Sequence, residues 1–436
     1  MSTVATGAQT RYLTVRPHSH LEGTVTVGGS TAMALGLLAT AGALRWKVKI
    51  TNVPWAGDVE SMLAVLPHAG MHTFSPVGES GSLVCWPASC VRGSQSGAGV
   101  MPRVFPEVSY LVPAMLASRG RARLPWPDDE QDDLVAQLQV YEEAFGDAVV
   151  RGDDGYQVTA ASPVPAVAVR LPVRWPGATV TTVLRAAAAR TRLALTNPYW
   201  GPETTSVLEA LRGCGFGVQA AQDELWLSPP AHEASGSLEW QVPGDPVEAA
   251  VLACAVAASG GSARIDGVYG PHLQAAVGVL TRAGLHLTLE DRSLRVYPTD
   301  FREVAGLRVT TSLSPGGLAP AFLPPLTALA LRFPGVHLLQ DELQTETMNA
   351  LLKELERFGV RVEVLSATVR RLTVSHPSGH TWMEARSPAV GSALMVAALA
   401  APASSVIKGM DAVYRRYRAL PGKLAFLGAD LVETSQ

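Results

Sequence analysis

Residues 242–289 read VPGDPVEAAVLACAVAASGGSARIDGVYGPHLQAAVGVLTRAGLHLTL, and this stretch holds one complete copy of the element that decides the fold. An Ala-rich segment comes first, and its apolar residues cover nearly every side of the helix that it favours. A short strand, a connector and a more polar helix follow, and that helix ends at Gly284. The residues after Gly284 alternate between apolar and polar, which is typical of a strand.

The same element occurs six times, although the copies share a pattern more than identical residues. In each copy a glycine ends the second helix, where the residue after the last turn must adopt the left-handed conformation. These glycines are Gly70, Gly146, Gly217, Gly284, Gly359 and Gly428, separated by 76, 71, 67, 75 and 69 residues. Solenoid repeats are usually shorter, roughly 20 to 45 residues. The spacing therefore favours repeats that pack in groups over repeats that merely stack.

The first helix of each repeat predicts how the groups pack. A helix that is apolar on nearly every side must be surrounded by protein, so these helices should form inner bundles with strands and second helices outside. We therefore predict an α/β protein of two lobes with three repeats each. The Pro- and Ser-containing stretch at 228–246 marks the break between the lobes. A cleft between two such lobes is the expected ligand site.

Composition excludes several classes of protein. The 436 residues are 47% hydrophobic and 17% charged, which excludes a wholly disordered or collagen-like chain. With 35 basic and 38 acidic residues the net charge is −3, so we expect no nucleic-acid partner. The four cysteines are too few and too scattered for a disulfide framework, and we predict a cytoplasmic protein. The longest apolar stretches are shorter than a membrane span, so we expect no membrane partner.

Three stretches resemble one family. Residues 15–41, VRPHSHLEGTVTVGGSTAMALGLLATA, are similar without a gap to the first strand, glycine turn and helix of the enolpyruvyl transferase superfamily. Residues 176–189, PGATVTTVLRAAAA, resemble its branch of UDP-N-acetylglucosamine enolpyruvyl transferases. Residues 242–261 are more similar to its branch of 5-enolpyruvylshikimate-3-phosphate synthases. The resemblance covers essentially the whole chain.

The resemblance implies a particular fold and reaction. Each lobe should be an inside-out α/β barrel, with residues 22–236 in the first lobe and residues 1–21 plus 237–436 in the second. The family adds a substrate hydroxyl to phosphoenolpyruvate and then eliminates phosphate. That reaction needs cations around the anion, an acid for the methylene carbon and a base for the hydroxyl.

This chain departs from the family at the cations. After the glycine turn the family has a lysine that contacts phosphoenolpyruvate, and Thr31 stands at that position. A hydroxyl cannot stabilise phosphate charge comparably. The chain has only five lysines, and none lies near this turn in sequence. Thr31 is kept as a substrate-binding candidate.

The second repeat contains the stretch LPWPDDEQDDLV at residues 124–135, which is the counterpart of a mobile family loop. Asp128 matches the acid/base position of that loop. Further acidic residues crowd the place of a phosphate-binding arginine, and like charges at contact distance repel by about 1 kcal/mol even in water. The alternative interpretation is a solvated first helical turn, which favours Pro and acidic residues.

In the fifth repeat the resemblance places Pro325 where the family has a catalytic aspartate. Glu346 matches a family glutamate and is a catalytic candidate, although a surface helix residue is the alternative. Met348 and Asn349 stand where either branch would have its arginine. The sixth repeat lacks the family's Asp or His with Arg, although Arg386 lies close by.

A few groups for binding an anion remain. Arg103 matches an arginine of the second repeat if a small gap is allowed, and Arg415 matches the late arginine of the sugar-nucleotide branch, with Arg416 beside it. The alternative for the VYRRYR stretch is a first helical turn whose tyrosines pack inward. Gly177 offers backbone N–H groups at a helix start to an anionic ligand.

Two histidines are further catalytic candidates. His18 and His20 are two residues apart and share a face if the segment is a strand. Imidazole titrates near neutral pH, so both could serve as acid/base groups facing the cleft, whereas a hydrogen-bonded linker is the alternative. Two histidines without a third ligand make a poor metal site, and we expect no metal and no cofactor.

Three hypotheses remain open. The favoured one is a repurposed enzyme that performs acid/base chemistry on a small metabolite in the cleft without phosphoenolpyruvate. Elimination, isomerisation or cyclisation would fit, and specialised metabolism is the expected setting. The second is a genuine carboxyvinyl transferase acting on a sugar nucleotide or related acceptor. The third is a non-catalytic binding protein.

Overall fold

A computed structural model describes residues 10–17, 19–88, 105–127, 132–162, 164–231, 238–300, 306–343, 345–375, 377 and 381–435. The chain separates into two compact lobes. The first lobe comprises residues 29–243 and 313–315, and the second comprises residues 1–28, 244–312 and 316–436.

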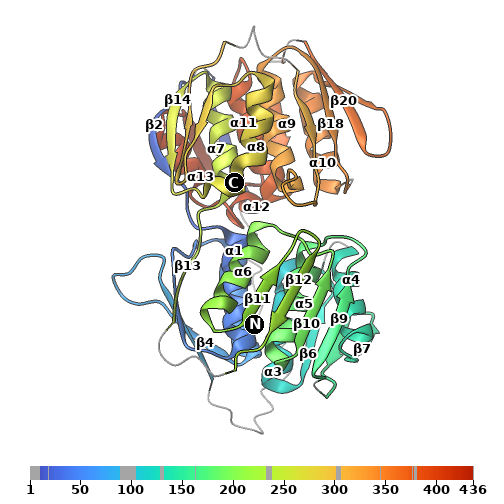
Figure 1. Cartoon of the computed structure of the whole chain (residues 1–436). Helices are drawn as coiled ribbons and strands as arrows, with labels where there is room; N and C mark the ends of the chain where they lie inside the picture. The colour runs from blue at the N-terminus through green and yellow to red at the C-terminus, as the bar shows by residue number, and fades with distance from the viewer. Residues whose placement is uncertain are drawn as a thin grey trace, which may run out of the picture. The chain divides into compact units, whose positions relative to one another are not determined.

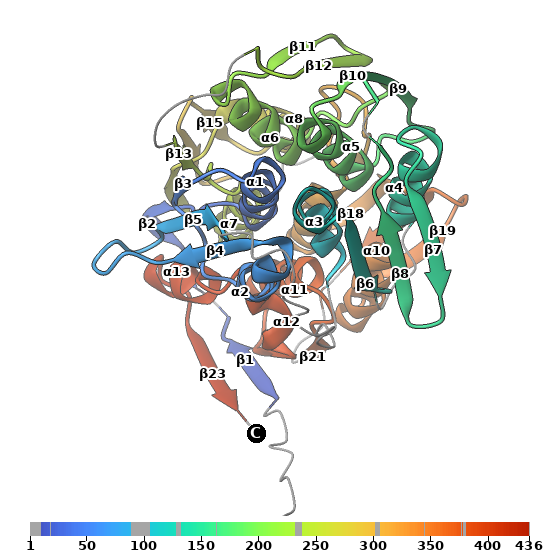
Figure 2. The same ribbon diagram turned by 90° about the horizontal axis from the view of Figure 1, so that it is seen from below.

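The first lobe has helices inside and sheets outside. Its helices are α1 (Thr31–Leu44), α2 (Gly57–Val65), α3 (Val112–Arg119), α4 (Asp132–Glu143), α5 (Pro176–Ala189) and α6 (Pro202–Gly213). Its strands are β3 (Val48–Thr51), β4 (Met71–Phe74), β5 (Leu83–Pro87), β6 (Arg121–Pro125), β7 (Ala148–Gly152), β8 (Gly155–Thr159), β9 (Ala166–Arg170), β10 (Arg192–Thr196), β11 (Gly217–Ala220), β12 (Glu224–Ser228) and β13 (Leu238–Gln241). Helices α1, α3 and α5 contact one another, and Figure 2 shows them nearly end-on with sheets around them. The sheet orders are β13-β3-β5-β4, β6-β8-β7 and β11-β12-β10-β9.

The second lobe repeats this plan. Its helices are α7 (Pro246–Ser259), α8 (Gly270–Ala283), α9 (Leu323–Leu329), α10 (Glu346–Leu355), α11 (Pro388–Ala400), α12 (Met410–Tyr414) and α13 (Leu420–Phe426). Its strands are β1 (Arg11–Val15), β2 (Glu22–Thr26), β14 (Ser262–Asp266), β15 (Leu287–Leu289), β16 (Ser293–Val296), β17 (Arg308–Thr310), β18 (Gly335–Gln340), β19 (Arg361–Val364), β20 (Val369–Val374), β21 (Thr381–Glu384), β22 (Ser405–Lys408) and β23 (Leu431–Ser435). Helices α7, α9 and α11 pack side by side inside, and the sheet orders are β15-β16-β14-β2, β17-β18-β20-β19 and β21-β22-β1-β23 (Figure 1). The predicted two-lobed α/β architecture is confirmed.

Helix α7 shows how the sequence forms an inner helix. The Asp245 carboxylate accepts the N–H groups of Val247 and Glu248, and a proline follows at the first helical position, so the start is well specified. Gly260 ends the helix with φ of 71°. Every residue of the helix except Val247 is buried. A buried valine or leucine contributes roughly 1.5 to 3 kcal/mol, which explains why such helices lie inside.

The first and fourth repeats differ from the third, fifth and sixth in the pairing of their strands. In the third, fifth and sixth repeats, the strand before the inner helix pairs in parallel with the strand after it, as β9 does with β10. The first and fourth repeats exchange these strands: β2 pairs with β14, and β13 pairs with β3. The lobes therefore divide at 28/29 and 243/244. Both divisions lie seven residues after the predicted boundaries, because each strand stays with its partner.

The prediction that a glycine ends the second helix was wrong at one of the six positions, Gly217. Gly70, Gly146, Gly284, Gly359 and Gly428 all have positive φ angles, as predicted. In the third repeat the left-handed residue is Gly215, with φ of 85°, and Gly217 instead begins β11. The stretch RGCGFG offers three glycines, and the one two residues after the end of α6 takes the turn.

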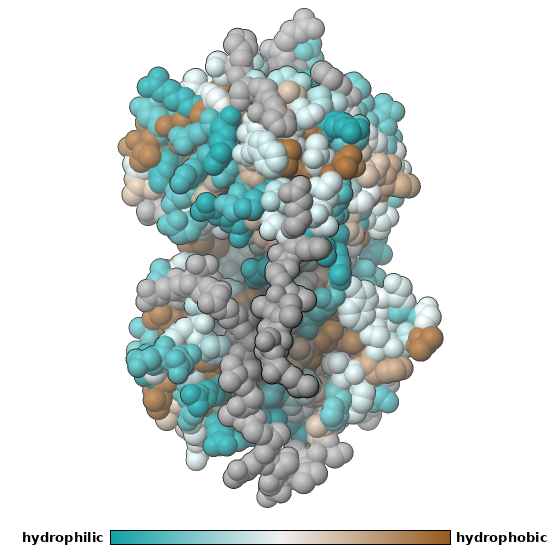
Figure 3. All heavy atoms as spheres, turned by 180° about the vertical axis from the view of Figure 1, so that it is seen from behind, coloured by the Kyte–Doolittle hydropathy of each residue, from teal (hydrophilic) through white to brown (hydrophobic). Residues whose placement is uncertain are grey.

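The distribution of surface hydrophobic residues, the length of the helices and the grouping of possible metal ligands concern the expected membrane and metal partners. On the face in Figure 3, hydrophobic residues occur in separate small groups among hydrophilic ones. Among the described residues no helix combines the length and the apolar character needed to cross a membrane. No group of three or more His, Cys, Asp or Glu side chains suited to a metal ion occurs in the described part of the chain.

Candidate functional site

The predicted site residues lie in both lobes. His18, Arg103 and Asp128 fall outside the described residues. Thr31 and Gly177 belong to the first lobe, and the other four belong to the second. Those four are His20, Glu346, Arg415 and Arg416.

The start of α5 is filled by a carboxylate of the same lobe. Gly177 N donates to Asp133 Oδ2 at 2.8 Å, and Ala178 N donates to Asp133 Oδ1 at 2.7 Å. Gln137 Nε2 lies 3.3 Å from Asp133 Oδ1. Helix starts attract anions because their first N–H groups lack partners within the helix. Gly177 was predicted to offer its N–H to an external anion, and here Asp133 already takes it.

Asp133 was not among the predicted site residues. Desolvation raises the pKa of its carboxyl, whereas the N–H groups of Gly177 and Ala178 oppose the shift. The acidic stretch at residues 128–133 predicted charge repulsion or a solvated first helical turn. At its last residue the acid instead caps the next inner helix, 44 residues away in sequence.

The start of α7 carries two carboxylates and an ammonium. Asp245 caps the helix, and Glu248 Oε2 accepts the N–H of Gly28 at 2.8 Å. Lys423 from α13 donates to Glu248 Oε1 at 2.8 Å and to Oε2 at 2.7 Å. The side chains are 17% exposed for Lys423 and 6% for Glu248, so the pair is largely removed from solvent. We call Gly28, Glu248 and Lys423 the glycine-turn cluster.

The glycine-turn cluster revises one prediction. No lysine lies near this turn in sequence, and we expected no ammonium there. In the structure a methyl group added to Gly28 would lie 3.6 Å from Lys423 Nζ, so the ammonium reaches the turn from the other end of the chain. Its charge is opposed by Glu248 at hydrogen-bond distance. Thr31 begins α1 and is buried.

His20 lies at the opposite end of α7 from this cluster. It is exposed, and its Nδ1 would be 4.0 Å from a methyl group added to Gly260, which ends α7. The 14 residues of α7 span roughly 21 Å at 1.5 Å per residue. The structure therefore does not bring His20 together with Glu248 and Lys423.

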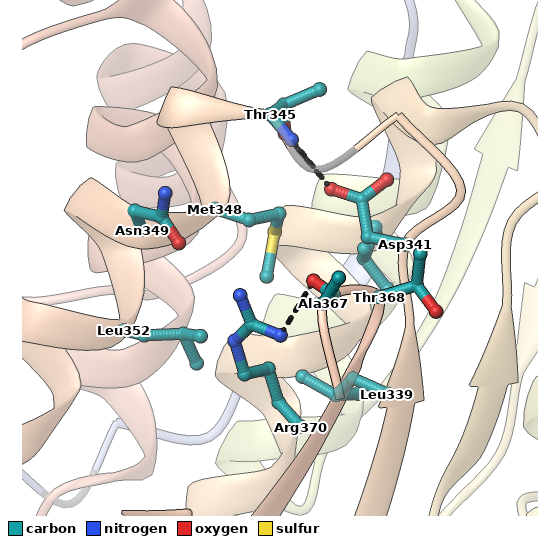
Figure 4. Close-up of a pocket in the computed structure, with 10 residues that line it drawn as sticks. Leu339, Asp341, Thr345, Met348, Asn349, Leu352, Ala367, Thr368 and Arg370 are labelled. Atoms are coloured by element: carbon teal, nitrogen blue, oxygen red, sulfur yellow. Dashed lines mark hydrogen bonds between the residues drawn. The ribbon is translucent and has the colours of Figure 1, made fainter. Parts of the chain in front are cut away.

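Glu346 is exposed at the first position of α10. The loop before it is organised by Asp341, whose Oδ2 accepts Thr345 N at 3.0 Å and Thr345 Oγ1 at 3.1 Å. Met348 and Asn349, which replace the expected arginine, line a pocket beside this loop together with Arg370 of β20 (Figure 4). The pocket therefore contains a guanidinium from a strand that sequence comparison did not point to.

The candidates after α12 are part of a packed turn. Arg415 is exposed and Arg416 is half-buried, and both make polar or ionic interactions. Tyr417 is 8% exposed, and Tyr414 packs against the core of the lobe. This agrees with the alternative in which the tyrosines of VYRRYR pack inward. Arg386 forms an exposed ion pair with Glu384 at 3.1 Å.

Comparison with known proteins decides the family. The family model described as EPSP synthase (3-phosphoshikimate 1-carboxyvinyltransferase) matches residues 147–424. The chain belongs to this family. The predicted membership of the enolpyruvyl transferase superfamily is therefore confirmed.

The curated relatives of this EPSP synthase family member match nearly its whole length. UDP-N-acetylglucosamine 1-carboxyvinyltransferase 1 of Streptococcus agalactiae is 23% identical over 430 residues, which cover 97% of this chain and 99% of the relative. The UDP-N-acetylglucosamine 1-carboxyvinyltransferase of Gluconacetobacter diazotrophicus is 26% identical over 419 residues, covering 94% and 96%.

Solved structures support the fold. The enolpyruvyl transferase NikO from Streptomyces tendae superposes with a TM-score of 0.80 at 20% identity, covering 98% of this chain and all of the other. EPSP synthase from Acinetobacter baumannii gives a TM-score of 0.74 at 14% identity, covering 97% and 100%. Both likenesses concern the fold of an enolpyruvyl transferase.

Proposed function

We propose that this enolpyruvyl transferase-family protein is a cytoplasmic enzyme that acts on a small metabolite by acid/base chemistry without phosphoenolpyruvate. Elimination, isomerisation and cyclisation are the reaction types in view, and specialised metabolism is the expected setting. The proposed compartment is supported by Cys85, Cys214 and Cys254, which are all buried and unpaired.

The observation that carries the proposal is that the chain places its own carboxylates where a phosphorylated ligand would need positive charge. Asp133 occupies the start of α5, and Asp245 and Glu248 occupy the start of α7. The ammonium of Lys423, which reaches the glycine turn, is neutralised by Glu248. A multiply charged anion at either helix start would meet a negative charge at contact distance, which disfavours its binding.

The acid/base groups of the proposal remain the sequence candidates. Glu346 is exposed at the start of α10 and is accessible to a ligand. His20 is also exposed, at the far end of α7. His18 and Asp128 lie outside the described residues and stay in the proposal on sequence grounds alone. Asp133 joins them because desolvation raises the pKa of its carboxyl, which suits a group that must exchange a proton.

A second candidate function is genuine carboxyvinyl transfer. It is favoured by the position of Lys423, because an ammonium does lie at the glycine turn. If a substrate phosphate displaced Glu248 from Lys423, the turn would regain its positive charge. The names of the curated relatives also support this candidate.

Two measurements separate the candidates. Calorimetry with phosphoenolpyruvate, with and without UDP-N-acetylglucosamine, measures binding, and a phosphate-release assay measures transfer. We expect neither micromolar binding nor phosphate release. If both occur, and if Lys423→Met abolishes the release while the exposed control Lys353→Met retains it, carboxyvinyl transfer is the function and our proposal is wrong.

The positive test is turnover of a candidate metabolite. We expect product formation that is reduced at least about tenfold by Glu346→Gln or Asp133→Asn, because each change removes a titratable proton but keeps the side-chain shape. Asp132→Asn is the matched control for Asp133→Asn, since Asp132 is exposed on the same helix. Turnover that survives both changes would remove Glu346 and Asp133 from the mechanism.

A further inference from the structure

A small pocket in the second lobe combines an apolar floor with polar groups at its rim. It is open to solvent, so the roughly 300 Å³ of space between its atoms includes part of the surrounding solvent. Three elements build it: the end of β18, the first turns of α10 and the turn between β19 and β20 (Figure 4). Leu323 of α9 also lines it. All of these elements belong to one lobe.

The floor is formed by hydrocarbon side chains. Leu323, Leu339, Met348 and Leu352 are each at most 5% exposed and face the pocket. Asp341 also lines it, but Oδ1 accepts Thr311 Oγ1 and Leu343 N, each at 3.3 Å, while Oδ2 accepts two donors of Thr345. Its carboxylate is therefore occupied in holding its own loop. The floor suits a short hydrocarbon group.

Arg370 presents hydrogen-bond donors to this pocket. Its Nη1 donates to the carbonyl oxygens of Ser366 at 2.8 Å and Ala367 at 2.9 Å, which fixes the guanidinium against the turn. A guanidinium has five N–H donors, and those on Nε and Nη2 have no hydrogen-bond partner within the described part of the chain. Figure 4 shows the guanidinium directed toward Met348 and Asn349.

Asn349 provides a second polar group. Its side chain is exposed on the first turns of α10, and its amide has no hydrogen-bond partner among the residues that the structure describes. Figure 4 shows the guanidinium below Met348 and between Leu352 and Leu339, with Asn349 on the other side of Met348. Donors held in this way match the two oxygens of a carboxylate, which a guanidinium binds through paired N–H bonds.

The charge of the pocket limits the ligand further. Among the described residues that line it, Arg370 and Asp341 carry charge, and they are of opposite sign. Asp341 already opposes the charge of Arg370, so a phosphate dianion would be repelled more strongly than a monoanion. We propose that the pocket binds a small aliphatic carboxylate, with Arg370 and Asn349 on its oxygens and Met348, Leu339 and Leu352 around its hydrocarbon.

Methionine methyl NMR tests this binding without any turnover, so its outcome is independent of the proposed function. The chain has 10 methionines, and Met348→Leu identifies the signal of the one in the pocket. Isovalerate is the probe, and 3-methylbutanol is its uncharged counterpart of similar shape. We expect isovalerate to shift the Met348 signal with a Kd on the order of 1 to 10 mM, as suits a ligand of this size. We expect the alcohol to bind at least about fivefold more weakly.

Matched variants test the role of the guanidinium. Arg370→Gln should weaken isovalerate binding at least about tenfold, because a charge-assisted bond is lost. Arg371→Gln is the control, since Arg371 is next on the same strand and pairs with Glu363 at 2.9 Å; its Kd should change less than twofold. Asn349→Asp places a negative charge at the exposed rim without disturbing the core and should weaken binding at least about fivefold.

Three results would overturn the proposal. The first is the absence of any Met348 shift at about 50 mM isovalerate, a concentration several times the highest expected Kd. The second is equal binding of the alcohol and the carboxylate. The third is retention of affinity in both Arg370→Gln and Asn349→Asp while their other methionine signals stay in place, which shows that the variants are folded.

Discussion

Helices α5 and α7 are inner helices of different lobes, and a carboxylate accepts the first N–H groups of each. The two carboxylates come from different places in the chain. At α5 the carboxylate is Asp133 from another helix, and no ion pair of Asp133 occurs among the described residues. At α7 the cap is the helix's own Asp245, and a second carboxylate, Glu248, pairs with Lys423. Repeats of one plan thus satisfy the N–H groups of a helix start either by an acid from another helix or by the acid that precedes the helix, and only α7 has an ion pair beside its start.

This difference has a chemical meaning. A desolvated acid without a cation has a raised pKa, as Asp133 has. A compensated pair holds its charge and responds instead to removal of either partner. The first lobe therefore has a capping acid without a countercharge among the described residues, and the second has a carboxylate at the glycine turn whose charge is balanced by Lys423.

The largest expected effect comes from breaking the compensated pair. Lys423→Met leaves Glu248 almost buried without its cation, and we expect the free energy of unfolding to fall by about 3 to 4 kcal/mol. Urea denaturation followed by circular dichroism measures this loss. Lys353→Met, an exposed lysine of α10 in the same lobe, should change it by less than about 0.5 kcal/mol.

The double variant Glu248→Gln with Lys423→Met checks the cause. Removing both charges should recover part of the stability, because no unpaired charge then remains buried. Equal losses in the single and double variants would mean that packing of the lysine stem, and not the ion pair, holds the glycine turn.

The next effect contrasts the lobes in their response to acid. Burial lowers the pKa of His337 in the second lobe to about 4, and its Nδ1 accepts the N–H of Leu307 at 3.0 Å. The unfolded chain takes up this proton near pH 6.5, earlier than the folded one. Titration of His337 therefore leaves the free energy of unfolding unchanged above pH 6.5. Between pH 6.5 and pH 4 it lowers the free energy of unfolding by about 3 kcal/mol in total.

Denaturation at several pH values tests the role of His337. His337→Gln should flatten the loss between pH 6.5 and 4, whereas the exposed His286→Gln should leave it unchanged. Asp133 acts in the opposite direction, because its raised pKa favours the folded first lobe as the pH falls toward 3.8. Eight of the nine tryptophans lie at residues 46–240 of the first lobe, so tryptophan fluorescence reports mainly on that lobe. A fluorescence transition that loses stability in parallel with the second lobe would contradict the contrast.

The smallest effect is expected at the start of α5. Asp133→Ala frees the N–H groups of Gly177 and Ala178, and we expect a loss of about 1 to 2 kcal/mol, as for other helix caps. Sulfate at high concentration should restore part of this stability in the variant but not in the native protein, because only the variant has an open helix start. The exposed Asp132→Ala is the control. An equal response of both proteins to sulfate would mean that Asp133 does not close the start of α5.

Much of the fold was predictable because it rests on local signals. The Ala-rich helices, the left-handed glycines such as Gly284 and the strands after them follow from periodicity and backbone conformation. The errors arose where the signal was ambiguous or non-local. Gly217 lost its role to Gly215 within one short glycine-rich stretch, and no local feature shows that β2 and β13 are exchanged between repeats.

The candidate sites were less predictable because their partners are far apart in sequence. Glu248 and Lys423 are separated by 175 residues, and Asp133 lies 44 residues before Gly177. Comparison with the family marked where cations were missing, at Thr31, Met348 and Asn349, but not which side chains had come near those places. Lys423 and Arg370 arrive from α13 and β20, so only the tertiary structure assigns them.

The exchanged strands have a consequence for synthesis on the ribosome. The first lobe is nearly all one continuous insertion, and its last strand, β13, emerges before any of the second lobe's inner helices. β1 emerges first, yet its partners are β22 and β23 at the far end of the chain. At roughly 5 to 20 residues per second, β1 therefore waits on the order of 20 to 80 seconds for both its neighbours. Until translation is complete, the backbone N–H and C=O groups of β1 remain unpaired on both sides and are open to pairing with another chain.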